Sequence, residues 1–190
     1  MLIFRKLPNR VADYQMHQLY NMCFTDQEWF SPTHLGKSSI IPRVPADEPI
    51  RSQKIEVPRQ SFNFFEYVNR SDDSIHFMID KKLDDFTKEW FPDIESTTTI
   101  LTKTRKGCMQ PPHKDKSRDY SIYIPIYPHM YDYSPMTFYY NNELQYIDNL
   151  DPGAMYLVNH KIMHSAFNFT DYDRFNLQIT LKEENALRFI

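Results

Sequence analysis

Two stretches decide how this chain is interpreted: QPPHKDKSRDYSIYIPIY at residues 110–127 and HSAFNFTDYDRFNLQITL at residues 164–181. Each stretch leads from a histidine into a run of β-branched and aromatic residues, which is typical of a strand. His113 and Asp115 are two residues apart in the first stretch. Side chains at positions i and i+2 of an extended chain point to the same face, so this imidazole and this carboxylate can converge on one cation.

Other short runs with strand composition surround these stretches. They are STTTILTKT (96–104), MTFYY (136–140), LQYI (144–147) and AMYLV (154–158). Asn141-Asn142 predicts a hairpin turn between two of them, and Asp151-Pro152-Gly153 predicts a turn before the last. The C-terminal half is therefore predicted to be a β-sandwich or barrel.

The N-terminal part has a different pattern. Residues 11–24 place apolar side chains near helical spacing, and residues 80–91 predict a helix that Asp80 opens and Pro92 ends. Residues 31–60 hold five of the 13 prolines and predict either a lid or a flexible connection. The expected fold class is α+β, mainly β, with the N-terminal helices packed on one sheet.

The length of 190 residues predicts a single domain. Within it, residues 1–92 would supply the helices and the proline-rich segment, and residues 96–182 would form the β core that carries the metal site. No apolar run approaches the roughly 18 residues that a membrane span needs. The N-terminus lacks the pattern of a signal peptide, so we expect a cytoplasmic protein without a membrane partner.

Composition excludes several classes of function. Only 3 glycines occur, too few for the glycine-rich loops that bind dinucleotides or nucleoside triphosphates. The 2 cysteines support neither a disulfide framework nor a cysteine-built zinc site. A net charge of −3 and a pI of about 6.1 argue against a nucleic-acid partner.

His164 and Arg174 make the His113–Asp115 pair more specific. Chance alone gives about one histidine two residues from an acid in a chain of this composition, so the pair by itself is weak. His164 would complete two imidazoles and one carboxylate, the ligand set of non-heme Fe(II) oxygenases. Arg174 opens a predicted strand ten residues later, where its guanidinium could bind a carboxylate through two hydrogen bonds.

The order His113-x-Asp115, His164, Arg174 resembles the 2-oxoglutarate- and Fe(II)-dependent oxygenases, over about residues 96–182. The resemblance implies a double-stranded β-helix, also called a jelly roll or cupin-like fold. It also implies Fe(II) held by His113, Asp115 and His164, and 2-oxoglutarate with its far carboxylate on Arg174. Dioxygen would then hydroxylate a small molecule or a peptide or protein side chain.

The flanking residues most resemble the aspartyl/asparaginyl β-hydroxylase branch of that superfamily. The counterparts here are Thr102, Gly107 and Pro112-His113. Well-known members of that branch lack the acidic ligand that this chain keeps at Asp115, which weakens any inference from their peptide substrates. Asn176 stands where many members of the superfamily have Ser or Thr, and its amide can still donate to a carboxylate from the face that Arg174 shares.

Several roles stay open at this stage. The resemblance makes Thr102 a helper for the oxoglutarate carboxylate, although threonine is also an ordinary strand residue. Tyr123 is either a cofactor contact or a core side chain. Arg118 is expected to be a solvated loop cation rather than a ligand for a substrate carboxylate, and His160 a structural or pocket-edge residue, because no helix surrounds the His160–His164 pair.

The alternative to an oxygenase is a cupin-like module that binds a metal or another ligand without oxygenase turnover. A metal-free structural barrel is a third possibility, which would require all four motif residues to be incidental. The offset between His164 and Arg174 favours the oxygenase, because a plain metal-binding barrel does not require that arginine.

Overall fold

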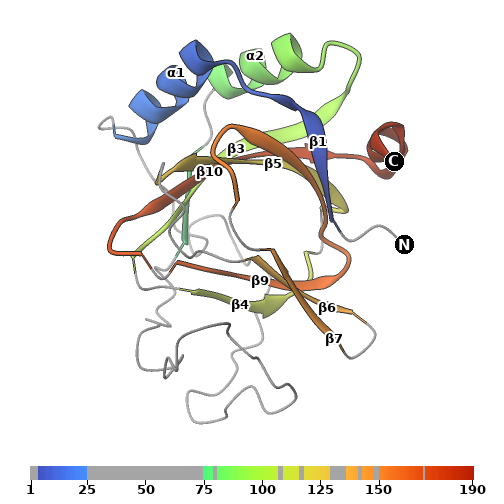
Figure 1. Cartoon of the computed structure of the whole chain (residues 1–190). Helices are drawn as coiled ribbons and strands as arrows, with labels where there is room; N and C mark the ends of the chain where they lie inside the picture. The colour runs from blue at the N-terminus through green and yellow to red at the C-terminus, as the bar shows by residue number, and fades with distance from the viewer. Residues whose placement is uncertain are drawn as a thin grey trace.

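The structure of the chain is a computed structural model. It describes residues 4–24, 75–78, 81–106, 109–115, 118–128, 136–140, 143–147, 150–168 and 170–190. The segment 31–60, predicted to be a lid or a connection, lies outside the described residues. The described part is mainly β, with antiparallel sheets and few helices (Figure 1).

Two helices of appreciable length occur where the sequence predicts them. Helix α1 spans Asp13–Cys23 and helix α2 spans Lys81–Trp90. Pro92 follows α2 closely, as expected for a residue that cannot continue a helix. The C-terminus adds the short helix α3, Glu183–Ala186, and the 3-10 turn η1, Leu187–Phe189. Among the described residues no helix is long and apolar enough to cross a membrane.

The larger of the two sheets has six strands. In spatial order they are β1 (Phe4–Arg10), β8 (Ala154–Asn159), β5 (Tyr120–Tyr127), β10 (Arg174–Leu181), β3 (Ser96–Thr104) and β2 (Ile75–Met78). Every pair of neighbours in it is antiparallel. The strand β10 that opens at Arg174 therefore lies at the centre of the sheet, between β5 and β3.

The smaller sheet has four strands. Their order is β4 (Met109–His113), β9 (Met163–Phe167), β6 (Met136–Tyr140) and β7 (Glu143–Ile147). Strands β6 and β7 pair antiparallel on either side of residues 141–142, which confirms the predicted hairpin. The turn at Asp151-Pro152-Gly153 is also confirmed, and Gly153 adopts a positive φ of 78°, where a residue without Cβ is favoured.

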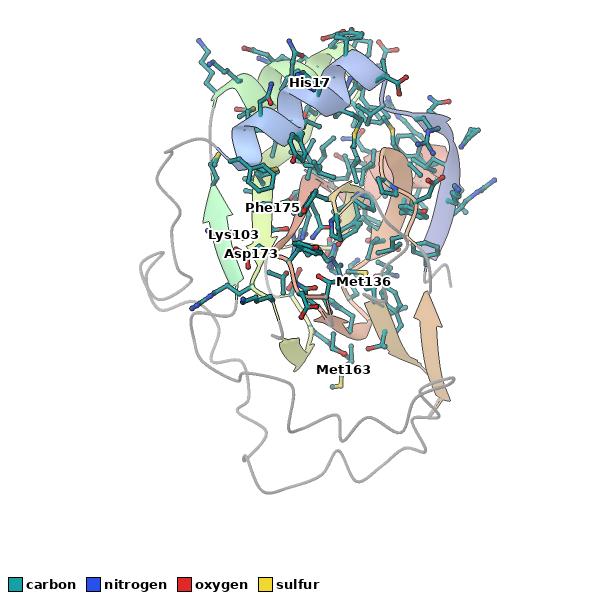
Figure 2. All side chains as sticks on the ribbon, turned by 60° about the vertical axis from the view of Figure 1, so that its left-hand side comes forward. His17, Lys103, Met136, Met163, Asp173 and Phe175 are labelled. Carbon is teal, nitrogen blue, oxygen red and sulfur yellow. The ribbon has the colours of Figure 1, made fainter. Side chains whose placement is uncertain are left out.

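The helices cover one face of the large sheet, as the sequence predicts (Figure 1). Alternate residues of each central strand point toward the helices, and the side chains at these positions are apolar. On β10 they are Phe175, Leu177, Ile179 and Leu181, all buried in one core with Leu19 of α1 and Leu83 of α2. Figure 2 shows His17 on this helical layer, well away from Met163 of the small sheet.

The other face of the large sheet is turned toward the small sheet and carries polar side chains. On β10 these are Arg174, Asn176 and Gln178, which alternate with the apolar residues of the helical face. Ser121 and Tyr123 are the equivalent residues of β5, and both are buried. A second, smaller apolar cluster lies on this side, including Phe138 of the small sheet together with Tyr123. This polar inner face is where the candidate site forms.

Four strands were not predicted: β1, β2, β4 and β9. β1 carries Pro8, and β4 carries Pro111 and Pro112, and both strands lie at the edge of their sheets. A proline has no N–H to donate, so the sequence argues against a strand there, yet an edge strand tolerates it. β2 has only 4 residues, and β9, MHSAF, has fewer of the β-branched and aromatic residues by which β6 and β7 were predicted.

Candidate metal centre

His164 lies in the small sheet, with strand neighbours on both sides. It belongs to β9, and its Cα pairs with Phe138 of β6 and with His113 of β4. The side chain is 1% exposed, and its Nδ1 is 2.9 Å from the carbonyl oxygen of Ile162. A carbonyl can only accept, so Nδ1 carries the proton, and in the neutral form of the ring Nε2 presents a lone pair.

A shift in strand register places His113 opposite His164. Met109 pairs with Phe167 and the pairing slips by one residue between Gln110 and His113. The slip falls at the two prolines of β4, as expected for a bulge in an edge strand. The backbone thus brings the two predicted histidine ligands to facing positions of neighbouring strands, while the His113 side chain lies outside what the structure describes.

His160 lies in the turn between β8 and β9 and is also 1% exposed. Its Nδ1 is 3.2 Å from Nε2 of His164 and 3.2 Å from Oδ2 of Asp115. Its other ring nitrogen, Nε2, is 2.6 Å from Oγ of Ser121 on the large sheet. This residue was expected to be structural or at the edge of a pocket. The structure places it among the candidate metal donors.

Asp115 follows β4 and is held by both its main chain and its side chain. Its backbone N–H donates to the carbonyl oxygen of His160 over 3.3 Å. Oδ2 of its carboxylate accepts from Nε and Nη2 of Arg118, at 2.7 and 2.6 Å. The expectation that Arg118 is a solvated loop cation is wrong, because its side chain is 16% exposed and pairs with Asp115.

Asp115, His160 and His164 together form a His-His-Asp group that could hold a metal. Their ligand atoms all lie within 4.8 Å of one another. Two neighbouring ligand atoms, each about 2.1 Å from an octahedral metal, are about 3.0 Å apart. The 3.2 Å distances from His160 Nδ1 to His164 Nε2 and to Asp115 Oδ2 are close to this spacing. Two imidazoles and one carboxylate suit iron, manganese or zinc.

Arg174, which was predicted to bind the far carboxylate of 2-oxoglutarate, lies on the inner face of β10 and is 4% exposed. Its Nη2 donates to the hydroxyl of Tyr123, and its Nε is 3.5 Å from Oδ1 of Asn176. Burial raises the pKa of Tyr123, and the nearby Arg174 guanidinium opposes part of that increase. Tyr123 is therefore the neutral partner of a buried cation.

A chain of hydrogen bonds joins this arginine region to the carboxylate of Asp115. Thr102, opposite Asn176 in the register of β3 and β10, donates to the carbonyl oxygen of Asn176 over 3.3 Å. Gln178 Nε2 lies 3.5 Å from the Thr102 hydroxyl, and Gln178 Oε1 accepts from Arg118. Arg118 completes the chain at Asp115.

Sequence reasoning did not assign His160 or Arg118 to the metal group, and it did not single out Ser121. The available signals were weak: a His-x₃-His spacing outside a helix, and an arginine three residues after Asp115. Ser121 and His160 are 39 residues apart, and only the pairing of β5 with β8 brings their backbones close.

Comparisons with known proteins give only distant likenesses. No protein-family model matches the chain, and no curated protein does. A cupin domain from Bordetella pertussis Tohama I is 16% identical over 47% of this chain and 85% of its own, with a TM-score of 0.35. A non-heme alpha-ketoglutarate-dependent epimerase from nogalamycin biosynthesis is 12% identical over 56% of this chain and 60% of its own, with a TM-score of 0.43.

An oxalate decarboxylase of Bacillus subtilis is 14% identical over 57% of this chain, which spans only 26% of that protein, with a TM-score of 0.40. None of the three structures reaches a TM-score of 0.5, so these likenesses support no conclusion about the activity of this chain. The chain is a mainly β protein with a His-His-Asp group that could hold a metal.

Proposed function

We propose that the chain is an Fe(II)- and 2-oxoglutarate-dependent dioxygenase built on a double-stranded β-helix. It would use dioxygen to hydroxylate a small molecule or a peptide or protein side chain. The observation that carries the proposal is the hydrogen-bonded inner face that links buried Arg174 to the donor group around Asp115. The buried guanidinium of β10 is thus connected to a group of donors, between the two sheets, that could hold a metal.

The donors fit the implied metal. Asp115 and His164 belong both to the sequence motif and to the described group, and His113 is the motif's other imidazole. Bound iron would supply coordination positions for the keto acid and for dioxygen. The protein would bind the far carboxylate of 2-oxoglutarate with Arg174, and Tyr123, Thr102 and Asn176 would line that end of the site.

Burial is the second contribution of the protein. Tyr123, Thr102, Arg174 and Asn176 are each at most 4% exposed, so an anion bound among them is shielded from water. In such surroundings a guanidinium–carboxylate pair is stronger than at a surface. The polar side chains also hold the arginine in one orientation, which reduces the cost of ordering it when the ligand binds.

One observation favours the alternative, a cupin-like module that binds a metal without oxygenase turnover. Arg174 donates within the protein to Tyr123 and Asn176. These contacts are also what a purely structural arginine would make. The two functions differ in whether 2-oxoglutarate binds at the metal.

Anaerobic titration of the metal-free protein with Fe(II) and then with 2-oxoglutarate tests the proposal. We expect the visible charge-transfer band of a keto acid bound to iron. The band should be lost in His164→Ala, because this variant lacks a metal ligand. It should be weakened in Arg174→Ala, because this variant lacks the guanidinium that would bind the far carboxylate of 2-oxoglutarate. Arg188→Ala is the matched control, since Arg188 is exposed and donates to the backbone of Asp93.

The outcomes separate the candidate functions. Tight iron binding without the band would contradict the oxygenase and support the cupin-like module. Failure to bind any divalent metal would contradict both. A band that is equally strong in Arg174→Ala and Arg188→Ala would remove Arg174 from the 2-oxoglutarate site.

A further inference from the structure

His160 is a buried histidine whose two ring nitrogens face two different kinds of partner. We propose that His160 is itself a ligand of the metal, through Nδ1, and that Ser121 holds its ring in the binding orientation. The inference rests on the metal site of the proposed function and gives the second histidine position to His160 rather than to His113. Three protein ligands leave an octahedral iron three positions for the keto acid and dioxygen.

The hydrogen bonds of the two imidazoles support this role. The Nδ1–H of His164 donates to the carbonyl oxygen of Ile162, which leaves the lone pair of Nε2 toward His160. With Nε2–H of His160 donating to Ser121 Oγ over 2.6 Å, Nδ1 of His160 presents a lone pair as well. Metal-binding histidines commonly donate their other N–H to a fixed oxygen in this way.

The surroundings of the three donors favour a cation between them. The carboxylate of Asp115 is an acceptor only, so in this tautomer its Oδ2 and the two ring nitrogens direct lone pairs at one another. Both imidazoles are 1% exposed, so little water is available to solvate them. Buried acceptors that face each other repel, and a bound cation turns that repulsion into attraction.

The backbone fixes His160 before any metal binds. Its N–H donates to the carbonyl oxygen of Asp119 over 2.8 Å, and its own carbonyl oxygen accepts from the N–H of Asp115 over 3.3 Å. Two donors of the group are thus tied to each other through the main chain. A site held in this way loses little conformational entropy on binding, which favours affinity.

The test measures metal binding by the full chain without 2-oxoglutarate. Metal-free protein is titrated with Co(II) against a chromophoric chelator, and the visible Co(II) spectrum reports the donors. We expect His160→Gln to lose more than about tenfold in affinity and to change the spectrum, because one nitrogen ligand is gone. Ser121→Ala should lose about tenfold, as is typical for a residue that orients a ligand.

The control is His17→Gln, which removes an exposed imidazole of helix α1 and should leave affinity and spectrum unchanged (Figure 2). Thermal unfolding of each metal-free variant shows whether it is folded, and His160→Asn serves if His160→Gln is not. Affinity and spectrum equal to those of the wild type in a folded His160 variant would overturn the assignment.

Failure of this inference is distinguishable from failure of the proposed function. If wild-type protein does not bind Co(II), the metal site itself is wrong. If wild-type protein and the His160 variants bind equally, only the role of His160 is wrong, and His113→Ala then tests the ligand set of the motif. The 2-oxoglutarate band is measured separately and depends on Arg174.

Discussion

At the scale of single residues, ionisable groups have different surroundings on the two sides of the large sheet. On the inner side, the buried cation Arg174 of β10 and the carboxylate of Asp115, which follows β4 of the small sheet, have polar partners from the protein. On the helical side, Cys23 is surrounded by apolar core residues, and its thiol donates to the carbonyl oxygen of Leu19 over 3.2 Å. Burial without a compensating charge raises the pKa of Cys23 to about 12.

This shift predicts that Cys23 destabilises the fold at alkaline pH. The folded-state pKa lies above the ordinary value of about 8.5 for a thiol, so the unfolded chain loses its proton first as the pH rises. Ionisation of Cys23 therefore leaves the free energy of unfolding unchanged below about pH 8.5. Between about pH 8.5 and pH 12 it lowers the free energy of unfolding by up to about 1.4 kcal/mol per pH unit.

Urea unfolding at pH 8 and pH 10.5 checks this prediction. The wild type should lose more stability between these values than Cys23→Ala does, because other titrating groups are common to both proteins. In a Cys108→Ser background, iodoacetamide at pH 8 should label Cys23 only when the protein unfolds. Rapid labelling of the folded protein would contradict the buried, protonated thiol.

At the scale of secondary-structure elements, β10 supplies two different surfaces from one strand. Its apolar residues face the helices, and its polar residues face the small sheet. Gln178 of β10 bonds to Arg118, and Arg118 bonds to Asp115, which follows β4 of the small sheet. The two sheets are therefore connected by a charged link as well as by the apolar cluster between them.

Breaking this link should destabilise the metal-free protein. Arg118→Met leaves the mostly buried carboxylate of Asp115 without its guanidinium, at a cost of about 2–3 kcal/mol, below the value for a fully buried pair. Arg118→Lys should cost less, since it keeps the charge but not the two-pronged contact. Urea unfolding measures both variants, with the exposed Arg105→Met as control. Equal stability of Arg118→Met and Arg105→Met would contradict the link.

At the scale of the whole molecule, the described chain is a layer of helices, a large sheet and a small sheet (Figure 1). The donor group lies between the sheets, because it includes His164 of β9 and His160, which contacts Ser121 of β5. Asp115 and His164 come from the small-sheet side, while His160 reaches Ser121 of the large sheet. A metal bound by these residues would join elements that are far apart in sequence. Its binding free energy would then add to the stability of the folded state.

Metal removal should therefore lower the melting temperature. At a free Zn(II) or Co(II) concentration of 100 times the Kd, the folded state gains about 2.7 kcal/mol, or roughly 5–10 °C in a chain of this size. Calorimetry with and without a chelator measures the difference. The shift should disappear in His164→Ala and persist in His17→Gln, and a shift of the same size in both would place the metal elsewhere.

The sequence by itself determined which segments form the central elements, and it predicted two residues, Asp115 and His164, of the group that could hold a metal. Helices α1 and α2 and strands β3, β5, β6, β7, β8 and β10 occur where composition and periodicity predict them, because each buries a regular face. The motif also singled out Asp115, His164 and Arg174, whose residue types and spacing are informative without any fold. The proline-containing edge strands β1 and β4 were not predicted, because their pairing depends on a neighbouring strand rather than on their own residues.

Only the tertiary structure decided which side chains meet at the site. His160 and Ser121 contact each other across 39 residues of sequence, and Arg118 reaches Gln178 across 60. No local pattern records such contacts, because they depend on the order and register of the strands. A one-residue slip at the prolines of β4 is enough to bring His113 opposite His164. Local propensities thus determined the elements, whereas long-range strand pairing determined the candidate site.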